Sequence, residues 1–205
     1  MKGGYDPSAA AAAATKIKWL KREDWDGLVD AAAEERREEL LGIRDQAIIA
    51  LGLSSGLRVS ELCNLNVEDL DLKDRRLTVR RGKGGKPRPG RFSEDARDLI
   101  EIWLQVRPTQ PEDTAREQRG PLWISRKGGR LAARTVREMM QKAGEKAALG
   151  HVHPHMLRHS CATELLRKTN NLRQVQVHLG HARITTTEIY AHVINNDLEK
   201  AVEDL

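Results

Sequence analysis

Apolar residues between positions 40 and 53 recur at the spacing of an α-helix, and this run constrains the fold most strongly. Ser54-Ser55-Gly56 ends the pattern, which therefore predicts one long apolar helix. Leu, Ile, Val and Ala must supply most of the core, because only 3% of the residues are aromatic. A chain of 205 residues is long enough for one domain with a sizeable core, or for one domain and a tail.

The remaining pattern predicts further helices and few strands. The helices are expected near residues 23–29, 58–65, 93–106, 135–149, 154 onward, 172–179, 183–190 and 195–204. Leu77-Thr78-Val79 alternates as a strand, followed by a turn at 82–85. A return strand over 86–92 is doubtful because Pro87, Pro89 and Gly90 disfavour pairing. Trp123 lies in a short buried strand or extended segment. We expect a mainly α fold with a small antiparallel β-sheet (α+β).

The two ends of the chain differ in character. Residues 1–17 contain Gly3-Gly4, Pro7 and a run of alanines, which is typical of a flexible tail or linker. Folded structure is expected over 18–205. The sequence has no stretch of eighteen apolar residues, so no membrane span is expected, and the N-terminus lacks the layout of a secretory signal. Cys63 and Cys161 lie in apolar helical patterns and are interpreted as buried free thiols of a reducing compartment, so we expect a cytoplasmic protein.

The positive charge is concentrated in one segment. The chain has a net charge of +5, yet residues 73–91 contain nine Lys or Arg and one acid, Asp74. A basic patch on a near-neutral body indicates a polyanionic partner at one face, and a solvated charged loop is the alternative. The residues of this segment that we expect to contact double-stranded DNA are Arg80, Arg81, Lys86 and Arg88.

Several residues fit the cleavage of a DNA phosphodiester without a metal ion. Tyr190 is the candidate nucleophile, since the only other tyrosine, Tyr5, lies in the tail. Planar arginine forks suit the charge on the non-bridging oxygens, and Arg58 and Arg158 open or lie early in predicted helices. His155 is three residues from Arg158, so both project from one helical face, and it is the candidate base for the phenol. Lys83, at the tip of a basic hairpin, is placed to protonate the leaving 5′-oxygen, and His181 to hydrogen-bond a non-bridging oxygen.

These residues lie in motifs that resemble the catalytic domain of tyrosine recombinases and phage integrases, especially the Xer-type branch. GLRVSEL, with Arg58, resembles the first box of that family, and GKGGKPR resembles its lysine hairpin. HPHMLRHSCATELL resembles the second box, and VHLGHARITTTEIYAHV the closing segment with the nucleophile. The matches come in the family's order from Arg58 to His192.

The resemblance implies a mechanism and a set of partners. It maps Arg58, Lys83, His155, Arg158, His181 and Tyr190 onto the six catalytic positions, and Glu61 onto a supporting acidic position. It implies a covalent 3′-phosphotyrosyl intermediate, no metal or other cofactor, and a homotetramer on two DNA sites. The segment 195–204 would dock on a neighbouring protomer, although packing on its own domain is the alternative. Such a protein would be nucleoid-associated or encoded by a mobile element.

Three features depart from the family pattern. Only about seventeen residues precede the catalytic region, so we expect the usual N-terminal core-binding domain to be absent, either because the chain is a truncation or because it works with a partial clamp. Pro89-Gly90 interrupts the strand after the lysine hairpin, which leaves the position of Lys83 least defined. Cys161 stands where a bulky aromatic is common.

Other interpretations remain open at the level of sequence. A type IB topoisomerase-like enzyme would use the same chemistry to relax DNA, and a DNA-binding module would be inactive without its N-terminal domain. A metal-dependent nuclease would lose activity with a chelator. His155 and His159 have the i, i+4 spacing of a zinc site, but Arg158 between them would repel a cation. We expect His159 to pack or hydrogen-bond within its own helix.

Overall fold

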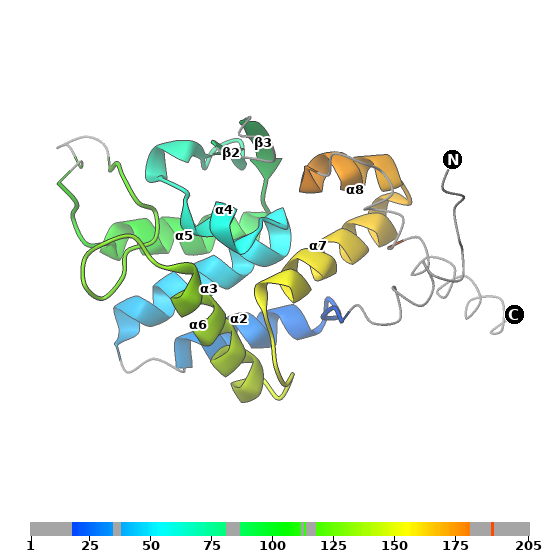
Figure 1. Ribbon diagram of the computed structural model, residues 1–205, viewed down its shortest axis with the longest axis horizontal. Coiled ribbons are helices and arrows are strands. Elements are labelled where there is room, and N and C mark those ends of the chain that lie inside the picture. The colour runs from blue at the N-terminus through cyan, green and yellow to red at the C-terminus, as the bar shows by residue number, and fades with distance from the viewer. Residues whose placement is uncertain are drawn as a thin grey trace, which may run out of the picture.

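The computed structural model describes residues 18–34, 38–80, 87–111, 113, 118–180 and 190. Over these residues the chain is mostly helical, with one three-stranded antiparallel sheet at the edge of the helical body (Figure 1). The expected mainly α fold with a small antiparallel sheet is confirmed. The predicted tail at 1–17 and the predicted helices at 183–190 and 195–204 lie outside the described residues.

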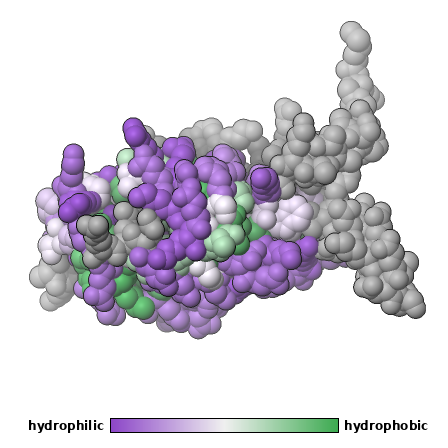
Figure 2. All heavy atoms as spheres, turned by 90° about the horizontal axis from the view of Figure 1, so that it is seen from below, coloured by the Kyte–Doolittle hydropathy of each residue, from purple (hydrophilic) through white to green (hydrophobic). Residues whose placement is uncertain are grey.

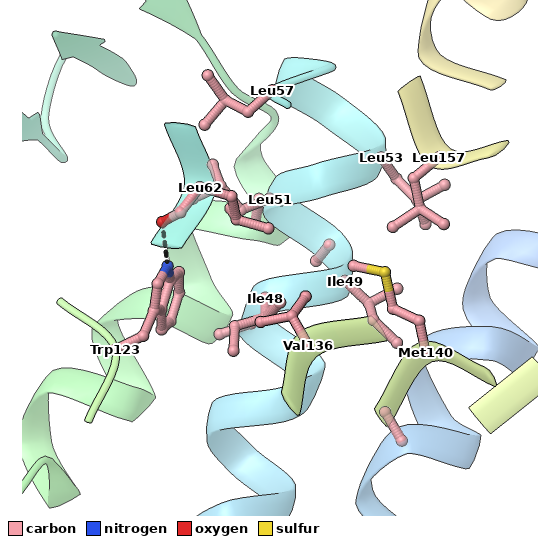
Figure 3. Packing of buried hydrophobic residues seen from close by; sticks show 14 of the residues in the cluster. Ile48, Ile49, Leu51, Leu53, Leu57, Leu62, Trp123, Val136, Met140 and Leu157 are labelled. Atoms are coloured by element: carbon pink, nitrogen blue, oxygen red, sulfur yellow. Dashed lines mark hydrogen bonds between the residues drawn. The ribbon is translucent and has the colours of Figure 1, made fainter. Parts of the chain in front are cut away.

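Helix α3 (Glu39–Ser55) is the centre of the body, as its apolar pattern predicts. It packs against α2 (Asp24–Glu34), α5 (Glu94–Val106) and α7 (Pro154–Thr169). Ile48, Ile49 and Leu51 are fully buried, with Leu157 of α7 and Met140 of α6 (Ala133–Lys146) packed around them (Figure 3). An apolar helix covered on several sides explains why α3 has no polar face.

Two buried tryptophans join the helices to the loops between them. The Nε1–H of Trp103 donates to Leu122 O at 2.8 Å. The Nε1–H of Trp123 donates to Leu62 O at 3.0 Å (Figure 3). Both side chains are fully buried, so each ring fills the core while its one donor is satisfied. The segment around Trp123 pairs through isolated bridges, one between Asn66 and Pro121 and one between Ile124 and Arg130.

The sheet has the order β1-β2-β3, with β1 at Leu70–Asp71, β2 at Arg76–Val79 and β3 at Arg88–Arg91. The return strand, which Pro87, Pro89 and Gly90 made doubtful, does form, and β3 pairs with β2 along its whole length. Phe92 N–H donates to Arg75 O, and the two-residue alternation of antiparallel bonds then leaves the nitrogen of Pro89 facing away from β2. Gly90 leaves room for Leu77, whose Cδ1 would lie 2.8 Å from an added Cβ.

Three short elements complete the described chain: α4 (Val59–Cys63), the 3-10 helix η1 (Val67–Asp69) and α8 (Leu172–Leu179). Helix α8 contacts both α7 and β3, and Figure 1 shows it beside them. A second, smaller core lies here, made by Ala162 and Leu166 of α7, Val175 and Leu179 of α8, and Tyr190. Tyr190 is thus part of the hydrophobic interior.

Both cysteines are free and buried, as their apolar patterns predict. None of the helices in the described ranges is long and apolar enough to cross a bilayer. The face in Figure 2 is mostly hydrophilic, with small hydrophobic areas between the polar side chains.

Candidate active site

Arg58 is held at the start of α4 by the carboxylate of Glu61. Gly56 ends α3 in the left-handed conformation, with φ 61°, and turns the chain so that Arg58 becomes the N-cap of α4. The backbone N–H of Arg58 donates to Glu61 Oε2 at 2.9 Å, and its Nη1 donates to Glu61 Oε1 at 3.0 Å. The Arg58 side chain is 35% exposed and that of Glu61 only 6%. A buried carboxylate therefore orients a guanidinium that still reaches solvent.

Arg158 lies beneath Arg58 and joins three segments. Helix α7 begins at Pro154, and its side chain at 158 is buried. One nitrogen donates to the carbonyl of Gly56, and the other donates to Leu179 O at 2.8 Å. Burial, and next the charge of Arg58, lower the Arg158 pKa to about 10, so it stays protonated at neutral pH. An anion such as a phosphate bound near both guanidinium groups would relieve their mutual repulsion.

Tyr190 is buried in the core, and its hydroxyl is hydrogen-bonded to His159. The side chain is 2% exposed, and its Oη lies 2.6 Å from His159 Nδ1. Burial raises the Tyr190 pKa to about 12, against a lowering effect of Arg158. Burial also lowers the His159 pKa to about 4, and the charges of His155 and Arg158 act in the same direction. At neutral pH the phenol and the imidazole are therefore both uncharged, and one hydrogen bond joins them.

His159 is the residue whose contact the sequence did not reveal. The sequence predicts that His159 packs or hydrogen-bonds within its own helix, but its ring is hydrogen-bonded to the hydroxyl of Tyr190, 31 positions away in the sequence. The only signal was its place beside Arg158 on α7. His155 is exposed, with its ring centroid 6.5 Å from that of His153. Its role as the base that activates Tyr190 stays a prediction.

Comparison with known proteins assigns the chain to a family. The family model described as "Phage integrase family" matches residues 18–197. The chain belongs to the phage integrase family. The tyrosine recombinase XerC of Pseudomonas savastanoi pv. phaseolicola is 45% identical over 167 residues, which cover 81% of this chain and 52% of that protein. XerC of Pseudomonas aeruginosa is 44% identical over the same coverage. The chain thus spans about half the length of the curated relatives it matches.

Solved structures match the same region. The crystal structure of XerA recombinase has a TM-score of 0.74 at 32% identity, covering 91% of this chain and 64% of that one. XerH bound to a palindromic difH substrate in a post-cleavage complex has a TM-score of 0.75 at 27% identity, covering 91% and 52%. The catalytic domain of bacteriophage HP1 integrase, at 22% identity and a TM-score of 0.63, shows the same fold. The chain is therefore a tyrosine recombinase catalytic domain.

The described structure reaches four of the six residues that the family resemblance marks as catalytic. Arg158 donates to the carbonyls of Gly56 and Leu179, and Arg58 follows Gly56 by two residues. Tyr190 is hydrogen-bonded to His159, and His155 lies one turn before His159 on α7. Lys83 and His181 lie outside the described residues. Lys83 belongs to the segment that connects the paired strands β2 and β3, and His181 follows Gly180, the C-cap of α8.

Arg80 and Arg88, two of the residues expected to contact DNA, are engaged in ion pairs. Arg80 binds the carboxylate of Asp69 and lies 3.1 Å from Glu68 Oε1, with its side chain 52% exposed. Arg88 is 14% exposed and donates to Glu61 at 2.9 Å. Arg81 and Lys86 lie outside the described residues. Contact of these four residues with DNA stays a prediction, and for Arg88 it would require the side chain to leave a buried carboxylate.

Proposed function

We propose that this chain cleaves and rejoins double-stranded DNA at specific sites through a covalent 3′-phosphotyrosyl intermediate. The observation that carries the proposal is that Arg158 donates to the carbonyl of Gly56, two residues before Arg58, while Tyr190 is hydrogen-bonded to His159, the residue after Arg158. The extent of the family match supports a catalytic unit over residues 18–205.

The two arginines have distinct roles in this reaction. Arg58 is partly exposed and oriented by Glu61, so its outer edge is available to a non-bridging oxygen. Arg158 is buried and donates hydrogen bonds to two backbone carbonyls, so its positive charge is held in a fixed position near the phosphate. As negative charge grows on the phosphate oxygens, such preorganised donors each contribute roughly a hundred- to thousand-fold in rate.

Cleavage requires Tyr190 to leave His159. The phenolate then attacks phosphorus, the bond from phosphorus to the 5′-oxygen breaks, and the leaving oxygen takes a proton. His155 accepts the phenol proton, Lys83 donates to the 5′-oxygen, and His181 hydrogen-bonds a non-bridging oxygen. A 5′-hydroxyl from a second duplex later attacks the phosphotyrosine. Because one phosphodiester replaces another, the exchange needs no external energy source.

The basic segment 73–91 supports binding to the DNA backbone. Arg80, Arg81 and Lys86 are the proposed phosphate contacts within it, whereas Arg88 binds the buried carboxylate of Glu61. Neutralising phosphates releases counterions, so the affinity should fall steeply as salt rises.

We also infer a homo-oligomer, with four protomers on two DNA sites. A groove of about 740 Å³ lies between β3 and α8, and it contains Arg76, Arg91, Arg173 and the exposed Val177. The segment 195–205 carries apolar Leu198 and Val202 among four acidic residues and one lysine. Its charge and apolar spacing complement the groove, which supports docking between protomers.

The bacterial cytoplasm is the compartment that we infer, in association with the nucleoid or a mobile element. The relatives named above are bacterial, and the DNA of such organisms lies in the cytoplasm. Two reduced, buried thiols are compatible with that compartment.

The proposal is tested by selecting random-sequence nicked duplexes for covalent attachment to the protein. A nick close to the scissile bond lets the short fragment that carries the freed 5′-hydroxyl diffuse away and traps the adduct. The wild-type chain should be recovered as a protein–DNA adduct that resists denaturant, whereas Tyr190→Phe should bind the selected duplex and form no adduct.

Further arms of this experiment separate other activities. Adduct formation that persists with a chelator argues against metal-dependent cleavage. Plasmid relaxation by monomer without recombinant product would replace recombination by a topoisomerase-like activity. Absence of any adduct across the selection would contradict the proposed function.

A further inference from the structure

The side chain of Arg88 bridges two elements of the candidate active site. It extends from the edge strand β3 into the protein and is only 14% exposed. Its Nη2 donates to Glu61 Oε2 at 2.9 Å, and its Nη1 donates to the carbonyl of His178 at 3.5 Å. One guanidinium therefore connects α4 with the end of α8.

Glu61 is shared between two arginines. Its Oε2 accepts from both the Arg58 backbone and Arg88, while its Oε1 accepts from the Arg58 guanidinium. Of the two arginines, Arg58 is the one that reaches solvent, at 35% exposure. Arg88 thus contacts the carboxylate from the protein side and leaves the other side to Arg58.

Gly180 provides the space that this bridge requires. A Cβ at Gly180 would lie 2.5 Å from both Cδ and Nε of Arg88, and the residue has φ 66°. Gly180 stands between Leu179, whose carbonyl accepts from Arg158, and His181. The Arg88 side chain therefore packs directly against the turn that joins two parts of the active site.

Stability alone does not explain an arginine at this position. Among the described residues, no hydrogen-bond partner lies within reach of the buried Nε of Arg88. An unsatisfied buried donor is unfavourable, and a well-packed apolar side chain would avoid that penalty.

We propose that Arg88 is a positioning residue, which fixes Glu61, and through it Arg58, against the turn that precedes His181. This inference rests on the proposed function. It makes Arg88 a part of the active-site frame rather than a direct contact of DNA phosphate, and it links the lysine hairpin to the phosphate-binding arginines.

The first test compares Arg88→Met with Arg80→Gln. Arg80 is a proposed phosphate contact whose side chain is 52% exposed, so its substitution removes the same charge from the surface. Arg80→Gln should reduce the slope of log affinity against log salt by about one unit, whereas Arg88→Met should not change it. A slope reduction of one unit for Arg88→Met would show that Arg88 contacts phosphate and would overturn the proposal.

The second test measures single-turnover cleavage of the selected nicked duplex at saturating protein. Arg88→Met should slow adduct formation by about 10- to 100-fold, the penalty of a misplaced catalytic group. A second duplex carries a methyl group in place of one charged oxygen of the scissile phosphate. On this duplex the rate defect of Arg88→Met should shrink to within about threefold, because the phosphate has less negative charge for Arg58 to stabilise. An equal defect on both duplexes would mean that Arg88 only supports folding.

A double-mutant cycle with Glu61→Gln completes the design. The double variant should cleave within about threefold of Glu61→Gln alone, since Arg88 acts through Glu61. If the rate effects of the two substitutions multiplied in the double variant, Arg88 would not act through Glu61. If Arg88→Met does not fold, Arg88→Lys takes its place in every arm, because it keeps the charge but not the bridge. If the wild-type chain forms no adduct, the proposed function fails and this inference falls with it.

Discussion

Replacing Gly56 with alanine probes the turn that positions both Arg58 and Arg158. The residue has φ 61°, which costs an L-residue about 1–2 kcal/mol. An added Cβ would lie 2.5 Å from Leu179 Cδ2 and 3.2 Å from Cys161 Sγ. Leu179 is fully buried, so it can move only by displacing its neighbours, and overpacking of this kind costs about 1–3 kcal/mol. The expected loss in the free energy of unfolding is therefore about 2–5 kcal/mol.

Two other glycines separate the contributions. Gly128 has φ 85° but nothing within 4 Å of an added Cβ, so Gly128→Ala should cost only the backbone strain of about 1–2 kcal/mol. Gly27 lies exposed in α2 with open space around it, so Gly27→Ala should stabilise the protein by about 0.5–1 kcal/mol. Urea unfolding, read from midpoints at constant m-value, gives all three values. Equal losses for Gly56→Ala and Gly128→Ala would refute the packing argument.

Three further predictions address the site and its support. Between pH 6.5 and 4 the unfolded chain binds more protons at His159 than the folded chain, whose His159 pKa is about 4, so the free energy of unfolding should fall as the pH drops through this window. In His159→Gln, urea midpoints measured across that range should fall less than in the wild-type protein. An equal fall in both proteins would contradict the assigned pKa. Arg158→Lys should slow adduct formation by roughly a hundred- to thousand-fold, since a point charge cannot reach Gly56 O, Leu179 O and a phosphate together, and a near-normal single-turnover rate would exclude that role. Trp123→Phe should cost about 1–3 kcal/mol in urea unfolding because it removes the donor to Leu62 O, and a neutral result would show that water replaces that bond.

Local patterns predicted the helices well, because their signals are carried by neighbouring residues. The apolar spacing before Gly56 predicted α3, and Ser93 predicted the start of α5, where its Oγ accepts from Ala96 N–H. Strand β3 was obscured because Pro89 and Gly90 disfavour pairing in isolation. Their tolerance depends on the register with β2 and on β3 lying at the sheet edge, and neither is visible in a local window.

The site was predictable to the level of motifs but not of contacts. Arg58 and Glu61 are three residues apart, so their pairing could be expected from helical spacing. The bond between His159 and Tyr190 and the bridge from Arg88 to Glu61 join segments 31 and 27 residues apart. Such contacts depend on how α7, α8 and β3 pack, which the sequence does not specify locally.

The most direct test of the central claim is to locate the covalent link in the trapped protein–DNA adduct. After nuclease treatment and trypsin digestion, mass spectrometry should find the residual nucleotide on the peptide of residues 184–200, at Tyr190. A nucleotide on Tyr5, or on any residue other than Tyr190, would contradict the account.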